Sequence, residues 1–325
     1  MKKYIAYFIA LGTLLLTGAC NDEWKDEIYR KDVGIKASIN SQGVTNIYLP
    51  YTPNGEITYQ LPIIVGGSQM NETDLDVHIA VDKDTLADLN EARWKHRKDL
   101  YYLELDEQHY EFPSTTCHIS SGTCVGLYDI KFKFSGLNLV EKWVLPLTIV
   151  DNPSYNANPR KNYRKALLRI MPYNDYSGTY SSTNTKVFVE DNSSAMVANT
   201  RALYVVDENT CFFYAGVISE ELQDREKYKV LMTFNSDGTV YARAADPTNK
   251  MGFEAQTTPT YSQWVDDDAT YPYIKHHYTT IQLKYKYNDV TTYGEVNPIA
   301  YRAEGSMLME RKLNILMPEQ DQIQW

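Results

Sequence analysis

The most restrictive feature of the sequence is a repeated alternation of apolar and polar residues. In the segment 127–134, aromatic and aliphatic side chains occupy every second position and charged residues stand between most of them. Successive side chains of a β-strand point to opposite faces of its sheet, so this pattern predicts a strand with one buried face. The segment 280–287 repeats the pattern, whereas helical periodicity is rare. The chain is therefore predicted to be mostly β.

Shorter segments with strand-like composition are separated by turn residues. These segments are 57–65, 75–81, 143–150, 166–171, 211–218, 228–234 and 306–316. Many short strands joined by turns are typical of antiparallel sandwiches and barrels. One helix is expected, capped by Asp84 and ending near Lys98, with a long polar loop as the alternative.

Length and charge narrow the class of protein further. The chain has 325 residues, about twice the ~150 residues of a typical domain, and we place one domain at 34–172 and a second at 173–325. A net charge of −10 argues against a general nucleic-acid-binding protein, which needs a basic face. Four Cys in this length exclude a scaffold built from disulfides.

The N-terminus has the composition of an export signal. Lys2 and Lys3 precede an apolar run at 4–16, which is shorter than the ~20 residues needed to cross a bilayer. The small residues Gly18 and Ala19 then precede Cys20. This arrangement resembles a bacterial lipobox, with Thr17 where the pattern usually has Leu. The resemblance implies that residues 1–19 are removed and that Cys20 is lipidated; the alternative is an ordinary signal peptide with a chance cysteine.

The residues after Cys20 are strongly acidic, with four of them between positions 22 and 27. An acidic stretch at this place resembles the surface-export signal of Bacteroidetes lipoproteins, and a solvated tether is the alternative explanation. We treat 20–33 as an acidic tether. The resemblance implies attachment to the outer membrane through the lipid, facing the cell exterior, with the periplasmic face as the alternative.

The first domain carries further motifs that resemble a known family. They are Val81-Asp82, Tyr-Glu-Phe-Pro at 110–113, Ser121-Gly122, and Leu-Pro-Leu-Thr-Ile at 145–149. They resemble the N-terminal domains of Bacteroidetes lipoproteins whose domains are mostly of unknown function. The resemblance implies an immunoglobulin-like β-sandwich over 34–172.

The second domain opens with Tyr-Ser-Gly-Thr-Tyr at 176–180 and closes with Gly-Ser-Met-Leu at 305–308, followed by Arg311. These motifs resemble lipocalin-like C-terminal domains, which implies an antiparallel β-barrel over 173–325. Proteins with this pair of domains are similar to companions of outer-membrane glycan-uptake systems. The resemblance therefore implies non-catalytic binding of a polysaccharide or oligosaccharide, in a possible complex with an outer-membrane importer.

One segment before the 280–287 strand has the composition of a carbohydrate site, and we expect it to be a loop. Aromatic rings meet the apolar CH faces of sugars, and carboxylates accept hydrogen bonds from hydroxyls. The alternative is that its aromatic residues only cover the barrel end. A calcium site is less favoured, because three consecutive Asp lack the alternating spacing of a calcium loop. The candidates are Tyr261, Trp264, Asp266, Asp267, Asp268, Tyr271 and Tyr273.

The remaining cysteines and histidines suggest few other sites. In an exported protein, the spacing of Cys117 and Cys124 suits a disulfide that closes a hairpin, with free thiols or a metal site including His118 as alternatives. Cys211 lies in an apolar segment and is expected to be a buried thiol. His276 and His277 are adjacent, so on a strand they face opposite sides and cannot chelate together. No metal or cofactor is expected.

No catalytic motif of a common enzyme class is present in the sequence, so we do not expect an enzyme. The segment Asp84-Thr85-Leu86 resembles the O-glycosylation acceptor motif of Bacteroidetes, with helix capping as the alternative for Thr85. Two other function classes remain open. An adhesive or fimbrial subunit would donate the 306–316 strand to a neighbour, and a glycoside hydrolase would use two carboxylates across a cleft.

Overall fold

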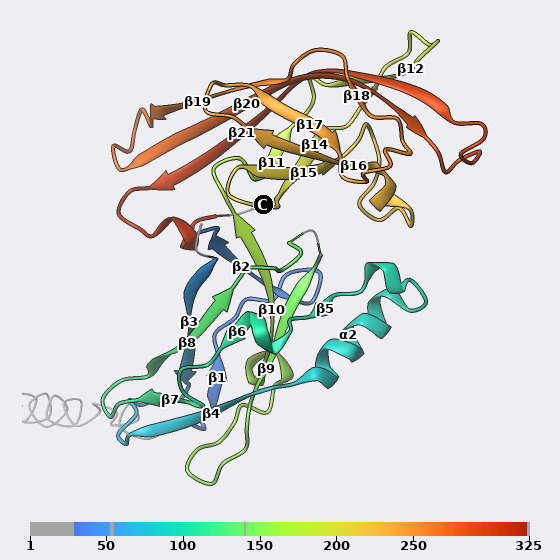
Figure 1. Ribbon diagram of the computed structural model, residues 1–325. Coiled ribbons are helices and arrows are strands. Elements are labelled where there is room, and N and C mark those ends of the chain that lie inside the picture. Colours follow the sequence, from blue (N-terminus) through green and yellow to red (C-terminus); the bar gives the residue numbers. More distant parts are fainter. Residues whose placement is uncertain (1–28, 53–54, 140, 324–325) are drawn as a thin grey trace, which may run out of the picture.

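The computed structural model describes residues 29–52, 55–139 and 141–323, and it shows two β-rich domains (Figure 1). Strand β10 (Lys165–Tyr173) ends the first domain and β11 (Gly178–Ser181) begins the second. The predicted signal peptide, Cys20 and most of the tether lie outside the described residues. Within the described ranges, no helix combines the length and the apolar character needed to span a membrane.

The first domain is a sandwich of two sheets. One sheet has the order β1-β3-β8-β6, and the other has the order β2-β10-β9-β4-β7 with β5 beside β9. Strands β2 and β10 run parallel, and the other pairs are antiparallel except β5 with β9. The strands are β1 (Val33–Ile35), β2 (Thr45–Pro50), β3 (Glu56–Val65), β4 (Leu75–Val81), β5 (Leu103–Glu104), β6 (Tyr110–Glu111), β7 (Thr116–Ile119), β8 (Val125–Lys133) and β9 (Trp143–Ile149).

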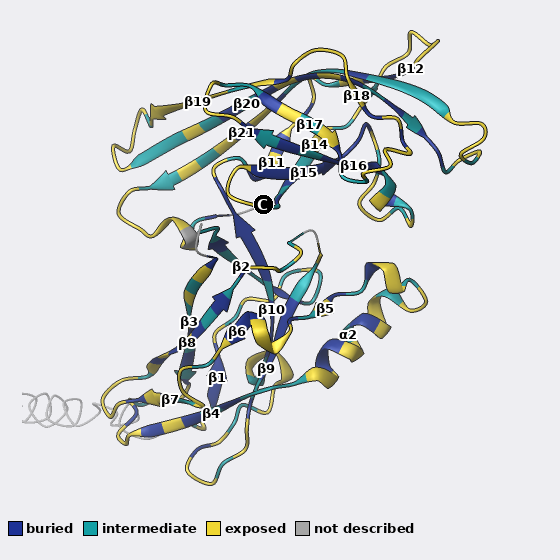
Figure 2. Cartoon of the chain, in the orientation of Figure 1, coloured by how far each residue is buried: buried dark blue, intermediate teal, exposed yellow. Residues whose placement is uncertain are grey.

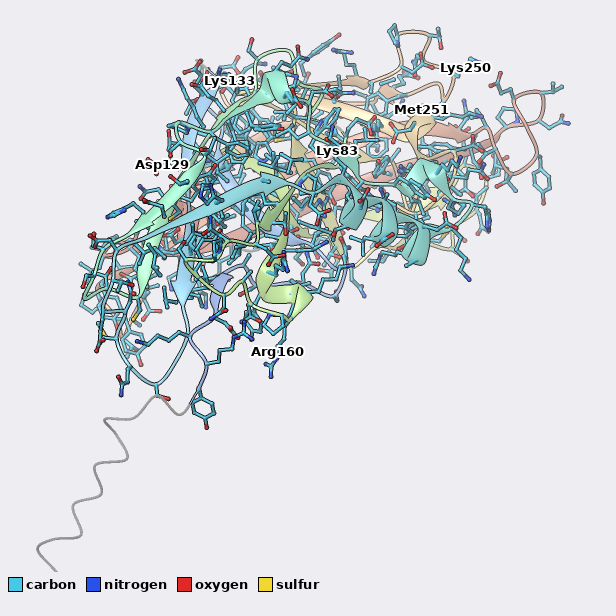
Figure 3. All side chains as sticks on the ribbon, turned by 90° about the horizontal axis from the view of Figure 1, so that it is seen from below. Lys83, Asp129, Lys133, Arg160, Lys250 and Met251 are labelled. Carbon is cyan, nitrogen blue, oxygen red and sulfur yellow. The ribbon has the colours of Figure 1, made fainter. Side chains whose placement is uncertain are left out.

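The alternation in the sequence places the core of the sandwich between these sheets. Along β8, Tyr128, Ile130 and Phe132 are buried, whereas Asp129 and Lys133 stand on the outer side (Figures 2 and 3). Burial of such apolar faces stabilises a domain by roughly 25 cal/mol per Å² removed from water. The immunoglobulin-like sandwich predicted from the resemblance is confirmed.

One helix covers the outer face of the second sheet. Helix α2 (Lys83–Trp94) packs Leu86 against a small cluster that includes Val144. Its N-cap is Asp82, whose carboxylate accepts from the backbone N–H of Thr85; the expected cap at Asp84 is wrong by two residues. The remaining helical segments are η2 (Lys98–Leu100), η3 (Glu107–His109), α3 (Lys161–Arg164), η4 (Arg225–Tyr228) and η5 (Glu319–Asp321).

The second domain is an antiparallel barrel. Its strands follow the path β11-β14-β15-β16-β17, and β20 pairs with β19 and with β21, which returns to β11 at the pair Ser181↔Leu308. The bridge Thr239↔Thr260 joins β17 to β19 and completes the path. The strands are β12 (Lys186–Val189), β13 (Met196–Val197), β14 (Thr200–Val205), β15 (Thr210–Tyr214), β16 (Lys229–Phe234), β17 (Val240–Ala244), β18 (Glu254–Ala255), β19 (Thr260–Asp267), β20 (Ile274–Asp289) and β21 (Ile299–Asn314).

Buried tyrosines fill the interior of the barrel. Tyr180, Tyr228, Tyr285 and Tyr287 are all nearly inaccessible to solvent. Their hydroxyls find partners: Tyr180 donates to the Tyr176 carbonyl, and Tyr285 accepts from the Gly216 N–H. A filled interior is typical of a small barrel. The predicted lipocalin-like barrel is confirmed, and a ligand would have to bind outside this interior.

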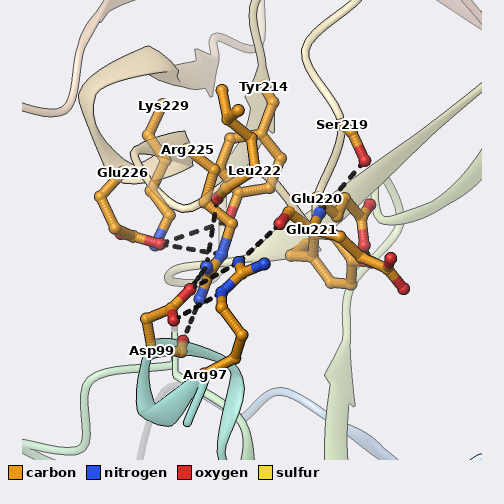
Figure 4. A network of polar contacts seen from close by, with 11 residues as sticks. Arg97, Asp99, Tyr214, Ser219, Glu220, Glu221, Leu222, Arg225, Glu226 and Lys229 are labelled. Atoms are coloured by element: carbon orange, nitrogen blue, oxygen red, sulfur yellow. Dashed lines mark hydrogen bonds and ion pairs between the residues drawn. The ribbon is translucent and has the colours of Figure 1, made fainter. Parts of the chain in front are cut away.

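A polar contact, which we call the interdomain clasp, joins the two domains (Figure 4). Arg225 in η4 is 7% exposed, and its guanidinium donates to the Asp99 carboxylate at 3.2 Å and to the Asp99 carbonyl at 2.5 Å. Arg97 binds the same carboxylate and also donates to the Glu221 carbonyl at 2.7 Å. Hydrogen bonds from Arg97 hold the pKa of Asp99 at about 2, so the carboxylate is ionised at neutral pH.

We expect the substitution Arg225→Gln to loosen the clasp, because the amide keeps part of the packing but loses the charge-assisted hydrogen bonds. The expected cost is about 2 kcal/mol in the free energy of unfolding, measured by urea denaturation. Small-angle X-ray scattering should show a larger radius of gyration. The control is Glu295→Gln, which breaks the exposed Lys250–Glu295 pair within the second domain; equal effects of both variants would contradict the role of the clasp.

Candidate functional site

The predicted aromatic and acidic segment forms a hairpin rather than a loop. Residues 260–267 are strand β19 and pair with β20, from Thr260↔Gln282 to Asp267↔Lys275. Only residues 268–273 form the turn. The expectation of a loop is wrong. Every side chain from Ser262 to Asp267 is exposed, so this strand lacks the apolar alternation by which a half-buried strand is predicted.

The pairing registers divide the candidate residues between the two faces of the hairpin. Trp264 is opposite Tyr278, which is opposite Glu310 on β21. Residues directly opposite one another share a face of the sheet, so these three side chains project to one side. Tyr261 belongs to the other face and packs edge-on against Tyr176 in the barrel. Tyr261 therefore supports the fold and does not share the surface of Trp264, contrary to the prediction that both belong to one site.

A row of stacked rings, which we call the aromatic platform, consists of the exposed Trp264 and the half-buried Tyr278 and His276. The Trp264 and Tyr278 ring centroids are 5.1 Å apart with planes 19° from parallel, and Tyr278 and His276 are 6.2 Å apart at 16°. Trp264 is 42% exposed, and its indole N–H donates to Asp266 at 3.2 Å. Since β19 pairs with β20 on one side only in this stretch, the other face of the indole is directed away from the sheet.

The carboxylates around the platform are mostly engaged in holding the hairpin. Asp268 accepts from the backbone N–H groups of Thr270 and Tyr271 and contacts His276 Nε2 at 3.0 Å. The hydrogen bond with His276 is the largest effect that lowers the pKa of Asp268 to about 2. Glu310 lies 2.6 Å from His276 Nδ1. These acids orient the imidazole beside Tyr278, and the described residues contain no cluster of metal-ligating groups.

The other candidates have separate roles. Asp267 forms an ion pair with Lys275 across the hairpin at 2.5 Å. Tyr271 and Tyr273 lie in the turn with their ring centroids 5.7 Å apart, and they are 53% and 38% exposed. The side chain of Asp266 forms a hydrogen bond only with the indole N–H among the described residues, so Asp266 is the acid whose oxygens are most available beside the platform.

A depression of about 350 Å³ adjoins Trp264. Its polar side chains include Gln263, His277 and Arg311, which lie on the inner face of the hairpin. Arg311 is held by the carbonyls of Asn174 and Ser177. Tyr278, His276 and Glu310 could not be predicted as neighbours of Trp264, because only the strand registers bring these residues together. The lining residues are Asp175, Gln263, Trp264, Val265, His277, Tyr278, Thr279, Met309, Arg311, Leu313 and Glu319.

The predicted Cys117–Cys124 disulfide is wrong, because both residues are free thiols. Cys117 lies on β7, which pairs with β4 in one sheet, whereas Cys124 precedes β8, which pairs with β3 in the other. The cysteines thus belong to facing sheets and not to one hairpin ladder. Burial raises the pKa of Cys117 to about 11, so this thiol is unreactive. Cys211 is a fully buried thiol, as expected.

The hydroxyl of Thr85 participates in the start of helix α2. Thr85 is 6% exposed; its hydroxyl donates to Asp82 at 2.8 Å and accepts from Lys165 at 2.8 Å. A sugar on this oxygen would replace the proton that Asp82 accepts and would need space that the fold does not leave. The structure favours the capping alternative over O-glycosylation of Thr85 in the folded chain.

His276 gives the hairpin a dependence on pH. Hydrogen bonds to Glu310, and secondarily to Asp268, raise its pKa above the ordinary 6.5. The ion pairs therefore contribute stability fully below pH 6.5, and this contribution is lost as pH rises through the higher folded pKa.

We expect an NMR titration to give an apparent pKa above 6.5 for His276, and the substitution Glu310→Gln should lower that pKa toward the ordinary value. His277, whose side chain projects from the opposite face, is the internal control. A wild-type value at or below 6.5 would contradict the described geometry.

Comparison with known proteins identifies relatives for both domains. A family model described as a domain of unknown function, DUF4973, matches residues 24–153, and a model described as a C-terminal domain matches 164–308. No curated protein matches the chain.

Several solved structures from Bacteroides are similar over most of the chain. A protein of unknown function from Bacteroides ovatus is 47% identical, covers 91% of this chain and 100% of its own, and has a TM-score of 0.81. A protein described as an auxiliary nutrient binding protein from Bacteroides thetaiotaomicron is 34% identical, with coverages of 89% and 100% and a TM-score of 0.77. The chain therefore belongs to the family of these two-domain Bacteroides proteins, with a first domain of the DUF4973 type.

Proposed function

We propose that this protein is a non-catalytic, lipid-anchored protein of the cell surface that binds an extracellular glycan for an outer-membrane uptake system. The observation that carries the proposal is the Trp264–Tyr278 stack, whose indole is 42% exposed. The description of a 34% identical relative as an auxiliary nutrient binding protein supports a role in binding.

The chemistry of the site suits a sugar. The free face of the Trp264 indole would contact the CH groups of a pyranose ring, as aromatic residues do in amphipathic ligand sites. The Asp266 carboxylate, 3.2 Å from the indole nitrogen, would accept hydrogen bonds from hydroxyls at the rim. Gln263 and His277 project from the opposite face of the hairpin, so the polar contacts of this site come from Asp266. Tyr278 fixes the orientation of the indole before a ligand arrives, which lowers the entropic cost of binding.

The arrangement of acids favours binding over hydrolysis. A glycosidase needs two carboxylates that face each other across the scissile bond. Here Asp268 contacts Nε2 of His276 and Glu310 contacts Nδ1 of the same ring. Asp267 forms an ion pair with Lys275. These contacts stabilise the hairpin and leave Asp266 as the acceptor next to the platform.

The structure also disfavours donation of the 306–316 strand, which a fimbrial subunit would require. Strand β21 contains most of this segment and pairs with β20 along its full 16 residues. It also pairs with β11 and β12. Release of β21 would therefore open the barrel and expose its aromatic interior.

Attachment through Cys20 would compensate for weak binding at a single exposed platform. A lipidated protein is confined to a surface, and several copies engaging one polysaccharide raise the effective concentration of each site. Stable attachment needs two or more acyl chains, which the lipobox resemblance implies.

Substitution of Trp264 by Ala should abolish detectable binding to the glycan that the wild-type protein selects. We expect this because the indole supplies most of the apolar contact. The measurement is a broad glycan array with protein that begins at residue 21, followed by calorimetry with the selected glycan.

The matched control is Tyr293→Ala, which removes a 70% exposed aromatic residue from the connection at the other end of the β20–β21 hairpin. Its affinity should equal that of the wild type. If no glycan binds the wild type, the proposed function is wrong; if Trp264→Ala binds normally, only the assigned site is wrong.

The substitution Cys20→Ser should release the protein from the membrane fraction, since serine has no thiol to accept the diacylglyceryl group. Fractionation of cells and protease shaving of intact cells would measure attachment and exposure separately. Persistence of the variant in washed membranes would contradict lipid anchoring, and protection of the wild type from the protease would favour the periplasmic face.

A further inference from the structure

A small cavity of about 40 Å³ lies between the two domains, beside the interdomain clasp. The first domain contributes Lys142 and Arg169, and the second contributes Tyr204, Phe212 and Glu220. A cavity needs a volume of roughly 10–15 Å³ to hold one water molecule, so this cavity holds a few water molecules or one small ion. Figure 4 shows Tyr214 and Glu220, two of its lining residues, next to the clasp.

The first domain directs two cationic side chains to this cavity. Arg169 on β10 is opposite Val144 on β9, and Lys142 lies two residues before Val144, so both side chains project from the same face of the sheet. The Arg169 Nε atom is buried and has no hydrogen-bond partner. The ammonium group of Lys142 lies 5.7 Å from the centre of the Trp94 ring and has no hydrogen bond or ion pair with any residue that the structure describes.

Neighbouring acids do not neutralise this pair. The Glu220 carboxylate accepts from the Tyr204 hydroxyl at 2.8 Å, and Glu141 is exposed. Neither acid lies within ion-pair distance of Lys142 or Arg169 among the described residues. Burial, together with the positive charges of Arg169 and Arg225, lowers the pKa of Lys142 to about 8. A buried donor without an acceptor and a half-buried cation without a counter-ion are both unfavourable.

We propose that this cavity binds one small monovalent anion, a halide or a carboxylate of formate size, between Lys142 and Arg169. The anion accepts hydrogen bonds from the Arg169 Nε–H and the Lys142 ammonium group. The rings of Phe212 and Tyr204 close the cavity from the second domain and exclude larger anions. Since the cations and the covering rings come from different domains, bound anion stabilises their docked arrangement. This site is independent of the proposed glycan function.

The first experiment measures thermal unfolding of the full chain in chloride and in formate, against gluconate at the same ionic strength. The wild-type Tm should rise saturably with chloride and formate and should not respond to gluconate. The Lys142→Met variant should be more stable than the wild type in gluconate, because it lacks the buried charge, and should show no saturable response.

The control variant is Lys250→Met, which removes an exposed lysine of the second domain; it should retain the full response. An equal response in Lys142→Met and Lys250→Met would overturn the proposal.

A second measurement locates the ion directly. Crystals grown in bromide should show an anomalous peak between Lys142 and Arg169. A peak without saturable stabilisation in solution would mean an adventitious ion only, and ordered water in the cavity at high bromide concentration would also overturn the proposal.

The stabilisation by the anion should also depend on pH. The groups that face Lys142 are Glu141 beside it, Arg169 on β10, Arg225 on η4, and the acids Glu220 and Glu221. Because the Lys142 pKa is lowered, its charge penalises the folded state at pH values below 8, and the penalty is relieved as pH rises.

The chloride effect should therefore fade above pH 8. In gluconate, the wild type should gain stability over the same range, and Lys142→Met should not gain it. A chloride response that is unchanged at pH 10 would contradict the role of Lys142.

Discussion

The backbone ladder between β20 and β21 is the interaction on which the second domain depends. Both strands are 16 residues long and pair without interruption from Ile274↔Asn314 to Asp289↔Ile299. One half of the ladder contributes Ile281, Tyr285 and Met307 to the barrel core. The other half is less buried, and most of its side chains are partly or fully exposed. Because the two strands are hydrogen-bonded along their whole length, the end that carries the platform is held in a fixed position relative to the barrel core.

The difference in burial between the two ends of the β20–β21 hairpin explains which structural features the sequence could predict. Segments 127–134 and 280–287 alternate because one face of each lies in a core, and burial imposes that pattern on the sequence. Residues 262–267 have no such constraint, so their strand was mistaken for a loop. Tyr278 lies 14 residues after Trp264, and the two residues are partners only because of the register between β19 and β20. The sequence alone does not predict this register.

Local spacing failed in the first domain for a related reason. The segment between Cys117 and Cys124 does not turn within one sheet but crosses from β7 in one layer to β8 in the other. Sequence separation suggests how close two residues can come, whereas the layer in which each strand pairs decides which side chains meet. The helix was easier to predict, because capping by Asp82 involves only neighbours in the sequence, and the error was a shift of two positions.

The direction of β3 has a consequence for how the molecule stands on a surface. This strand begins near the second domain, close to the end of β2, and ends at Val65, where it pairs with Val33 at the start of the described chain (Figure 1). The full height of the sandwich therefore lies between the barrel and the point where the chain enters the first domain. In a protein tethered at that point, the barrel would lie at the end of the molecule opposite the attachment. With the clasp restricting the joint between the domains, the platform would stay at this distal end, away from the point of attachment.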